Sequence, residues 1–154
     1  MSPPNEDVND ENAWHEACRD RVAQYLKDQG VVHGRIGEGP AWSVPGVMSV
    51  WAVASGRAPG RVGWWVLCGD GPTDYVSSQD IRSPREAVRA IAQRWQVACG
   101  YLARGEAPPD FELGSPDSRR QLAPLLESRA EFAACSASAA RRAVPAANSC
   151  AVAA

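Results

Sequence analysis

Two carboxylates spaced four residues apart are the residues best suited to chemistry in this sequence. Asp70 and Asp74 follow a dense apolar run, and Thr73 and Tyr75 add a hydroxyl and a phenol to the same short segment. If the loop folds the two acids together, they could hold a divalent cation or act as general acid and base. The pattern favours a simpler alternative, in which both aspartates cap turns and accept backbone N–H bonds while Tyr75 packs.

Other catalytic arrangements have weaker support. Cys68 could pair with His15 or His33 as nucleophile and base, but no G-x-S-x-G elbow is present. The glycine-rich stretch 34–40 lacks the G-K-[ST] of a phosphate-binding loop, and no third metal ligand stands at a recognisable spacing. We therefore expect no catalytic residue, no metal and no cofactor, and the sequence favours a non-enzymatic protein.

The tryptophans offer a possible binding surface. Trp64 and Trp65 are adjacent in a predicted strand, so they must point to opposite faces of it. One should face the helices, and the other should face either the loop that holds Trp42 or a ligand or partner. Single-stranded nucleic acid would need basic residues interleaved with these rings, and Arg57 and Arg61 alone flank them. We expect no nucleic-acid partner.

Four arginines gather on and beside a predicted helix that follows Ser83. They are Arg82, Arg85, Arg89 and Arg94. Charges on a helix surface are commonly a solvated face, and the alternative is a docking surface for an acidic partner. Arg85 and Arg89 are therefore candidate binding residues.

Composition and charge exclude several classes of protein. The chain has 154 residues, enough for one domain. Sixteen Lys and Arg against 18 Asp and Glu give a net charge of -2. This balance excludes a protein that attracts nucleic acid mainly through an excess of positive charge. No apolar run reaches the roughly 18 residues of a membrane span. The acidic N-terminus does not look like a secretory signal, and the five cysteines include no C-x-x-C pair, so we expect a cytoplasmic protein.

Three helices should position these residues. Trp14, Cys18, Val22 and Leu26 recur every four residues and predict a helix over 13–29. Ser83-Pro84-Arg85-Glu86 has the residues of a capped helix start, and an apolar stripe centred on Trp95 continues the helix to about 104. A third helix is expected over 115–134, with a kink or break at Pro124.

Two apolar runs, 47–54 and 61–68, predict a β-hairpin, and further strands are expected near 75–78 and 31–36. Together the elements predict an α+β fold: a small antiparallel sheet built on the central hairpin, with the two long helices on one face and the C-terminal helix closing an edge or the second face. We expect a disordered acidic lead-in over 1–11, a single α+β domain over 12–132 and an Ala-rich flexible tail over 133–154.

Several strings resemble a known family. They are Trp51-Ala52-Val53, Pro59-Gly60-x-Val62-Gly63-Trp64-Trp65-Val66, Gly69-Asp70-x-Pro72-Thr73-Asp74-Tyr75 and Pro84-Arg85-x-Ala87. Over about residues 12–105 the chain resembles a family of small bacterial proteins described only as a domain of unknown function. The resemblance implies a bacterial cytoplasmic protein with one compact domain. It brings no activity, cofactor or catalytic residue.

We therefore expect a non-enzymatic cytoplasmic protein-binding module, such as an adaptor or an immunity-type inhibitor of a bacterial toxin, with another protein as its partner and no membrane contact. The alternatives are a small-molecule binder and an enzyme, both centred on the Asp70–Tyr75 loop. The candidate binding residues are Trp42, Trp64, Trp65, Asp70, Thr73, Asp74, Tyr75, Arg85 and Arg89.

Overall fold

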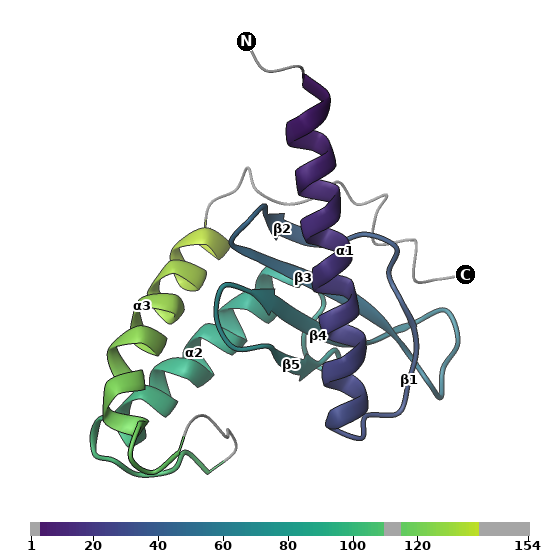
Figure 1. Ribbon diagram of the computed structural model, residues 1–154. Coiled ribbons are helices and arrows are strands. Elements are labelled where there is room, and N and C mark those ends of the chain that lie inside the picture. Colours follow the sequence, from purple (N-terminus) through teal and green to yellow (C-terminus); the bar gives the residue numbers. More distant parts are fainter. Residues whose placement is uncertain (1–3, 110–114, 139–154) are drawn as a thin grey trace.

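The computed structural model describes residues 4–109 and 115–138, and it confirms the α+β fold (Figure 1). The elements along the chain are α1 (Pro4–Asp28), β1 (His33–Ile36), β2 (Trp42–Val44), β3 (Met48–Ser55), β4 (Val62–Gly69), β5 (Asp74–Ser77), α2 (Pro84–Ala103) and α3 (Arg119–Ser138). Within these ranges no helix is long and apolar enough to cross a membrane.

The described strands form one antiparallel sheet in the order β1-β3-β4-β5, with β2 pairing with the start of β3. The central hairpin is the predicted one, and Trp51 lies opposite Val66 in its register. The short strand β2 was not predicted. Its three residues lie between Pro40 and Pro45, and a strand of that length shows no readable alternation.

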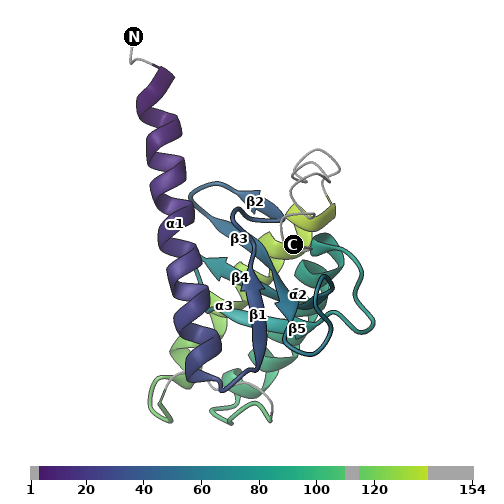
Figure 2. The ribbon, with the colours of Figure 1, turned by 90° about the vertical axis from the view of Figure 1, so that its right-hand side faces the viewer.

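The helices cover opposite faces of the sheet. Val50 and Ala52 of β3 pack toward α2 and α3, whereas the alternate residues Trp51 and Val53 pack against α1 (Figure 2). The expectation that the two long helices share one face is therefore wrong. Both faces of the hairpin are apolar and each needs a cover, but helical periodicity identifies a stripe without saying which face of the sheet it meets.

The N-terminal end of α2 is built as its sequence predicts. The Ser83 hydroxyl accepts the Glu86 N–H at 3.2 Å, and the Glu86 carboxylate accepts the Arg82 N–H at 2.8 Å. These two bonds satisfy backbone donors that a helix start leaves open. The stripe that follows buries Trp95 against the sheet.

The first helix begins earlier than predicted. It starts at Pro4, so residues 4–11 of the predicted disordered lead-in are helical. Asp7 lies at the end of its first turn, where negative charge is stabilised by the helix dipole, and Asp10 and Glu11 follow in the second turn. These three residues are exposed, so the hydrophobic pattern of the sequence could not reveal this part of the helix.

The last helix extends further than predicted. It continues through Pro124 without a break and ends at Ser138, with Ala133 and Ala137 completely buried. The prediction of a flexible tail is thus wrong for residues 133–138, because small side chains let a helix dock by close approach of its backbone. The rest of the predicted tail, 139–154, lies outside the described residues.

Candidate functional site

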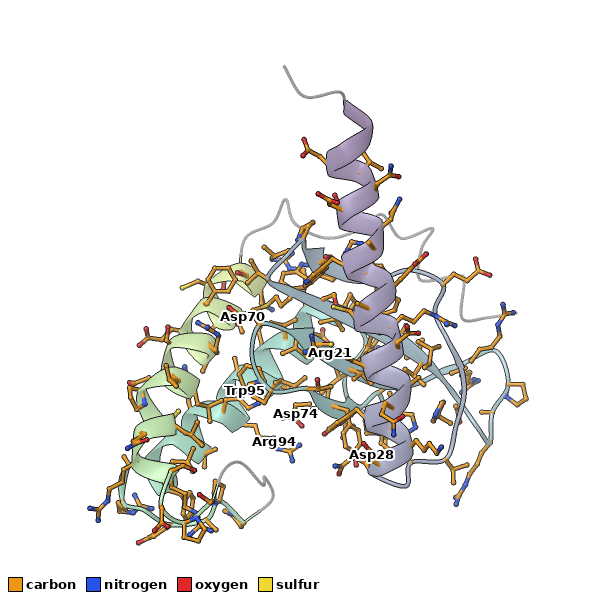
Figure 3. All side chains as sticks on the ribbon, in the orientation of Figure 1. Arg21, Asp28, Asp70, Asp74, Arg94 and Trp95 are labelled. Atoms are coloured by element: carbon orange, nitrogen blue, oxygen red, sulfur yellow. The ribbon has the colours of Figure 1, made fainter. Side chains whose placement is uncertain are left out.

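The two carboxylates of the Asp70–Tyr75 loop go to different helices. Asp70 is exposed and pairs with Arg129 of α3 at 3.0 Å, whereas Asp74 is 1% exposed and accepts the indole N–H of Trp95 of α2 at 3.1 Å. Figure 3 shows Asp74 beside Trp95 and Arg94, with Asp70 set apart from them. The acids therefore do not form a shared acid–base or cation site, and the described residues contain no group of three metal-ligating side chains.

Asp74 stabilises the junction between β5 and α2. Its carboxylate also accepts the Tyr75 N–H at 2.9 Å and faces the Arg94 guanidinium at 3.5 Å. Burial raises the pKa of Asp74, while Arg94 and the N–H groups of Tyr75 and Trp95 act in the opposite direction. Arg94 in turn donates to the Tyr75 carbonyl at 3.5 Å. The contacts of Asp74 are thus those of a structural carboxylate.

The rest of the loop packs back onto the domain. Thr73 is half-buried and lies close to the Cys68 thiol, whose pKa it lowers slightly against the larger effect of burial. Tyr75 is half-buried between two aromatic rings, with centroid distances of 5.5 Å to Trp64 and 5.8 Å to Tyr25. Within this segment, Asp70 and Gly71 are the exposed residues.

Two of the three candidate tryptophans are unavailable to a partner. Trp42 and Trp65 are buried on the face covered by α2 and α3, and the Trp65 indole N–H donates to the Ile81 carbonyl at 3.0 Å. Trp64 lies on the opposite face, half-buried beside α1. The sheet alternation expected of Trp64 and Trp65 is present, and helices cover both sides.

The candidate arginines hold the end of α3. Arg85 donates to the Ala137 carbonyl at 2.8 Å, and Arg89 reaches the same oxygen at 3.4 Å. Cations at the C-terminal end of a helix stabilise its orphan carbonyls and its dipole. The two side chains therefore join the start of α2 to the end of α3.

The possible cysteine–histidine pairs are not formed. Burial raises the pKa of the Cys68 thiol to about 11, and its sulfur neighbour is Cys18 of α1. His33 contacts the Gly34 carbonyl at 2.7 Å, and His15 contacts Ser43 at 2.9 Å. A buried, protonated thiol without a base beside it is a poor nucleophile.

An apolar groove, which sequence reasoning missed, lies between the loop and α3. It encloses about 220 Å³ and is lined by Asp70, Gly71, Pro72, Leu122, Leu125, Leu126 and Arg129. Leu125 is 60% exposed, and Phe132 further along the helix is 41% exposed. The sequence contained one indication of this groove, the leucines at 122, 125 and 126. Together they form an apolar stripe on the helix that is wider than packing against α2 alone requires.

A second cavity follows the outer side of β5. It measures about 350 Å³, opens to solvent, and is lined by Tyr75, Val76, Ser77, Gln79, Asp80, Ile81 and Arg94. Tyr75 is the one residue that it shares with the predicted binding set. The lining is more polar than that of the groove along α3.

Comparison with known proteins identifies the family of this chain but does not indicate a function. A family model described as a domain of unknown function (DUF4826) matches residues 8–140. The match spans all the described elements except the first residues of α1. Neither the curated proteins nor the solved structures contain a match.

Proposed function

The chain belongs to the family described as a domain of unknown function (DUF4826), and because that description carries no activity, we propose a function from geometry. The protein is a protein-binding module, and it contacts its partner through the α3 surface, defined here as Leu122, Leu125, Arg129 and Phe132 together with Pro72 of the β4–β5 loop. The observation that carries this proposal is the exposure of Leu125 in the lining of an apolar groove, with Phe132 exposed further along the same helix.

The α3 surface has the composition of a binding site. Residues 122, 125, 129 and 132 lie on one side of the helix because their spacings approximate whole turns. Protein interfaces place apolar anchors at their centre and polar groups at their rim. Here Asp70 and Arg129 form an exposed ion pair at the edge of the groove. An exposed pair adds little stability, but it can orient a partner.

We further propose that the setting is the bacterial cytoplasm, where the module acts as an adaptor or as an immunity-type inhibitor of a toxin. The strings of the Gly69–Tyr75 segment support the bacterial assignment by resemblance. Cys18, Cys68, Cys99 and Cys135 are thiols rather than disulfides, which suits a reducing compartment.

A second candidate function is the binding of a small polar molecule in the cavity along β5. Its volume of about 350 Å³ falls in the range of ligand sites, and Arg94, Gln79 and Asp80 supply polar groups. The α3 surface remains the stronger proposal because ligand pockets are more enclosed and more apolar than this cavity.

Site-specific photo-crosslinking would test the protein-binding proposal. A photoreactive amino acid at position 125 should capture one defined partner in host cells. The same amino acid at Val97, an equally exposed apolar residue on α2, should not capture it. With the purified partner, Leu125→Asp should weaken binding at least tenfold in calorimetry, and Val97→Asp should leave it unchanged. Equal capture at both positions, or equal affinity of both variants, would contradict the proposal.

A further inference from the structure

A serine and a histidine from distant parts of the chain meet at one edge of the sheet. The Nε2 atom of His15 lies 2.9 Å from the Oγ atom of Ser43, which joins α1 to β2. Trp42 and Val44 on either side of Ser43 point toward α2 and α3, so the alternation of β2 directs Ser43 toward α1. The spacing of 28 residues belongs to no sequence motif, which is why the pair was not predicted.

The imidazole of His15 packs against two indole rings. Its centroid lies 5.2 Å from that of Trp14 and 6.4 Å from that of Trp51, both in edge-on arrangements. Trp51 is itself fixed, because its indole N–H donates to the Ser49 hydroxyl at 2.8 Å. His15 and Ser43 are both half-buried, so the pair is oriented by the protein and still reachable from solvent.

This arrangement matches what an activated serine needs. A serine hydroxyl is a weak nucleophile until a neighbouring base removes its proton. Burial lowers the pKa of His15, which keeps the ring neutral and able to accept that proton. Glu11, one helical turn earlier, raises the pKa of His15 through its negative charge. It therefore favours the imidazolium that forms once the proton has moved.

We propose that Ser43 is a nucleophile with His15 as its general base, and that the pair acts on activated carboxylic esters. Ser43 Oγ bonds to the acyl carbon, its proton passes to His15 Nε2, and the ester oxygen departs with that proton as an alcohol. Water then attacks the acyl-serine, gives one proton to His15, and releases the acid as the proton returns to Ser43. This site lies on the α1 side of the sheet, apart from the α3 surface.

A fluorophosphonate probe would test the proposal on the full-length protein. The serine Oγ–P bond forms, the P–F bond breaks, and the serine proton leaves with fluoride by way of His15. We expect one adduct per chain, located on Ser43 by tandem mass spectrometry. Ser43→Ala should abolish it, and Ser128→Ala, which changes an exposed serine on α3, should leave the rate unchanged.

The decisive variant is His15→Gln. Glutamine can keep a hydrogen bond to Ser43 but cannot accept its proton, so it separates a structural role from a chemical one. The labelling rate should fall by about 100-fold or more. A rate within threefold of wild type would overturn the proposal. If His15→Gln fails to fold, His15→Asn replaces it, and failure of folded wild-type protein to form a Ser43 adduct overturns the proposal without any variant.

Discussion

The Asp74 carboxylate accepts the indole N–H of Trp95 at 3.1 Å, and this bond fastens β5 to α2 between two buried side chains. Each residue satisfies a need of the other. A buried carboxylate requires donors, and a buried indole requires an acceptor. The Asp70–Tyr75 loop is therefore part of the core at Asp74 and exposed to solvent at Asp70.

Trp95 should contribute both apolar area and its N–H group to stability. Trp95→Ala should lower the free energy of unfolding by about 3–5 kcal/mol, because it leaves a large cavity. Trp95→Phe keeps most of the apolar area but removes a donor to Asp74, so about 1–3 kcal/mol should be lost. Urea denaturation measures both values. A Phe variant as stable as wild type would show that the hydrogen bond contributes nothing.

The two aspartates of the loop should differ sharply in their effect on stability. Asp74→Ala leaves the N–H groups of Tyr75 and Trp95 without their acceptor, at about 1–3 kcal/mol for each. Asp70→Ala breaks an ion pair whose carboxylate is 61% exposed, which should cost about 0–1 kcal/mol. Thermal melts of the two variants provide the comparison, and equal losses would contradict the structural role given to Asp74.

The raised pKa of Asp74 predicts how stability changes with pH. The folded state holds this proton more tightly than the unfolded state, whose pKa is near 3.8. Apart from the hydrogen bonds that Asp74 accepts, the stability gained by binding this proton is therefore fully present below pH 3.8 and is lost as the pH rises through the higher folded-state pKa. Asp74→Asn does not titrate, so the unfolding free energy of wild type minus that of the variant should decrease over this window. A difference that increases with pH would mean that the pKa is lowered.

Gly69 should tolerate no side chain. A Cβ atom there would collide with the Val47 carbonyl oxygen and lie 2.6 Å from the Cα atom of Met48, and neither backbone atom can move aside cheaply. Gly69→Ala should cost at least the roughly 1–3 kcal/mol of an overpacked core. Gly39 has open space around it, so Gly39→Ala is the matched control and should change little. Equal melting temperatures for the two variants would show that the backbone of β3 can shift enough to accommodate a methyl group at position 69.

The docking of the last turns of α3 can be tested by adding volume. Ala133 is completely buried, so Ala133→Leu should overpack the contact with α2 and cost about 1–3 kcal/mol. Glu131 is exposed two residues earlier, and Glu131→Leu should stay within about 0.5 kcal/mol of wild type. If both variants are as stable as wild type, residues 133–138 do not pack as described.

Local residue patterns predicted the helices and strands well, but they predicted poorly how these elements pack together. The start of α2 was readable because its cap, its proline and its stripe are contiguous in the chain. Asp70 and Asp74 look alike in the sequence, yet one is exposed and the other buried, because β5 begins at Asp74 and turns it inward. Four residues of strand are too few to show that alternation.

Long-range pairings were beyond sequence reasoning for a different reason. The groove beside Pro72 depends on where α3 lies relative to the β4–β5 loop, and the contact of His15 with Ser43 depends on which face α1 covers. A hydrophobic stripe records that a helix is buried on one side. The stripe does not indicate which of the two apolar faces of the sheet the helix packs against.

The position of α1 has a consequence for synthesis. Its buried residues Cys18, Val22 and Leu26 pack on β3 and β4, whose last contributor to that cluster is Cys68. A ribosome that adds about 5–20 residues per second needs roughly 2–8 s to proceed from the end of α1 at Asp28 to Cys68. During that interval the apolar stripe of the nascent helix has no sheet to cover it, so chaperones that bind exposed apolar segments can bind it.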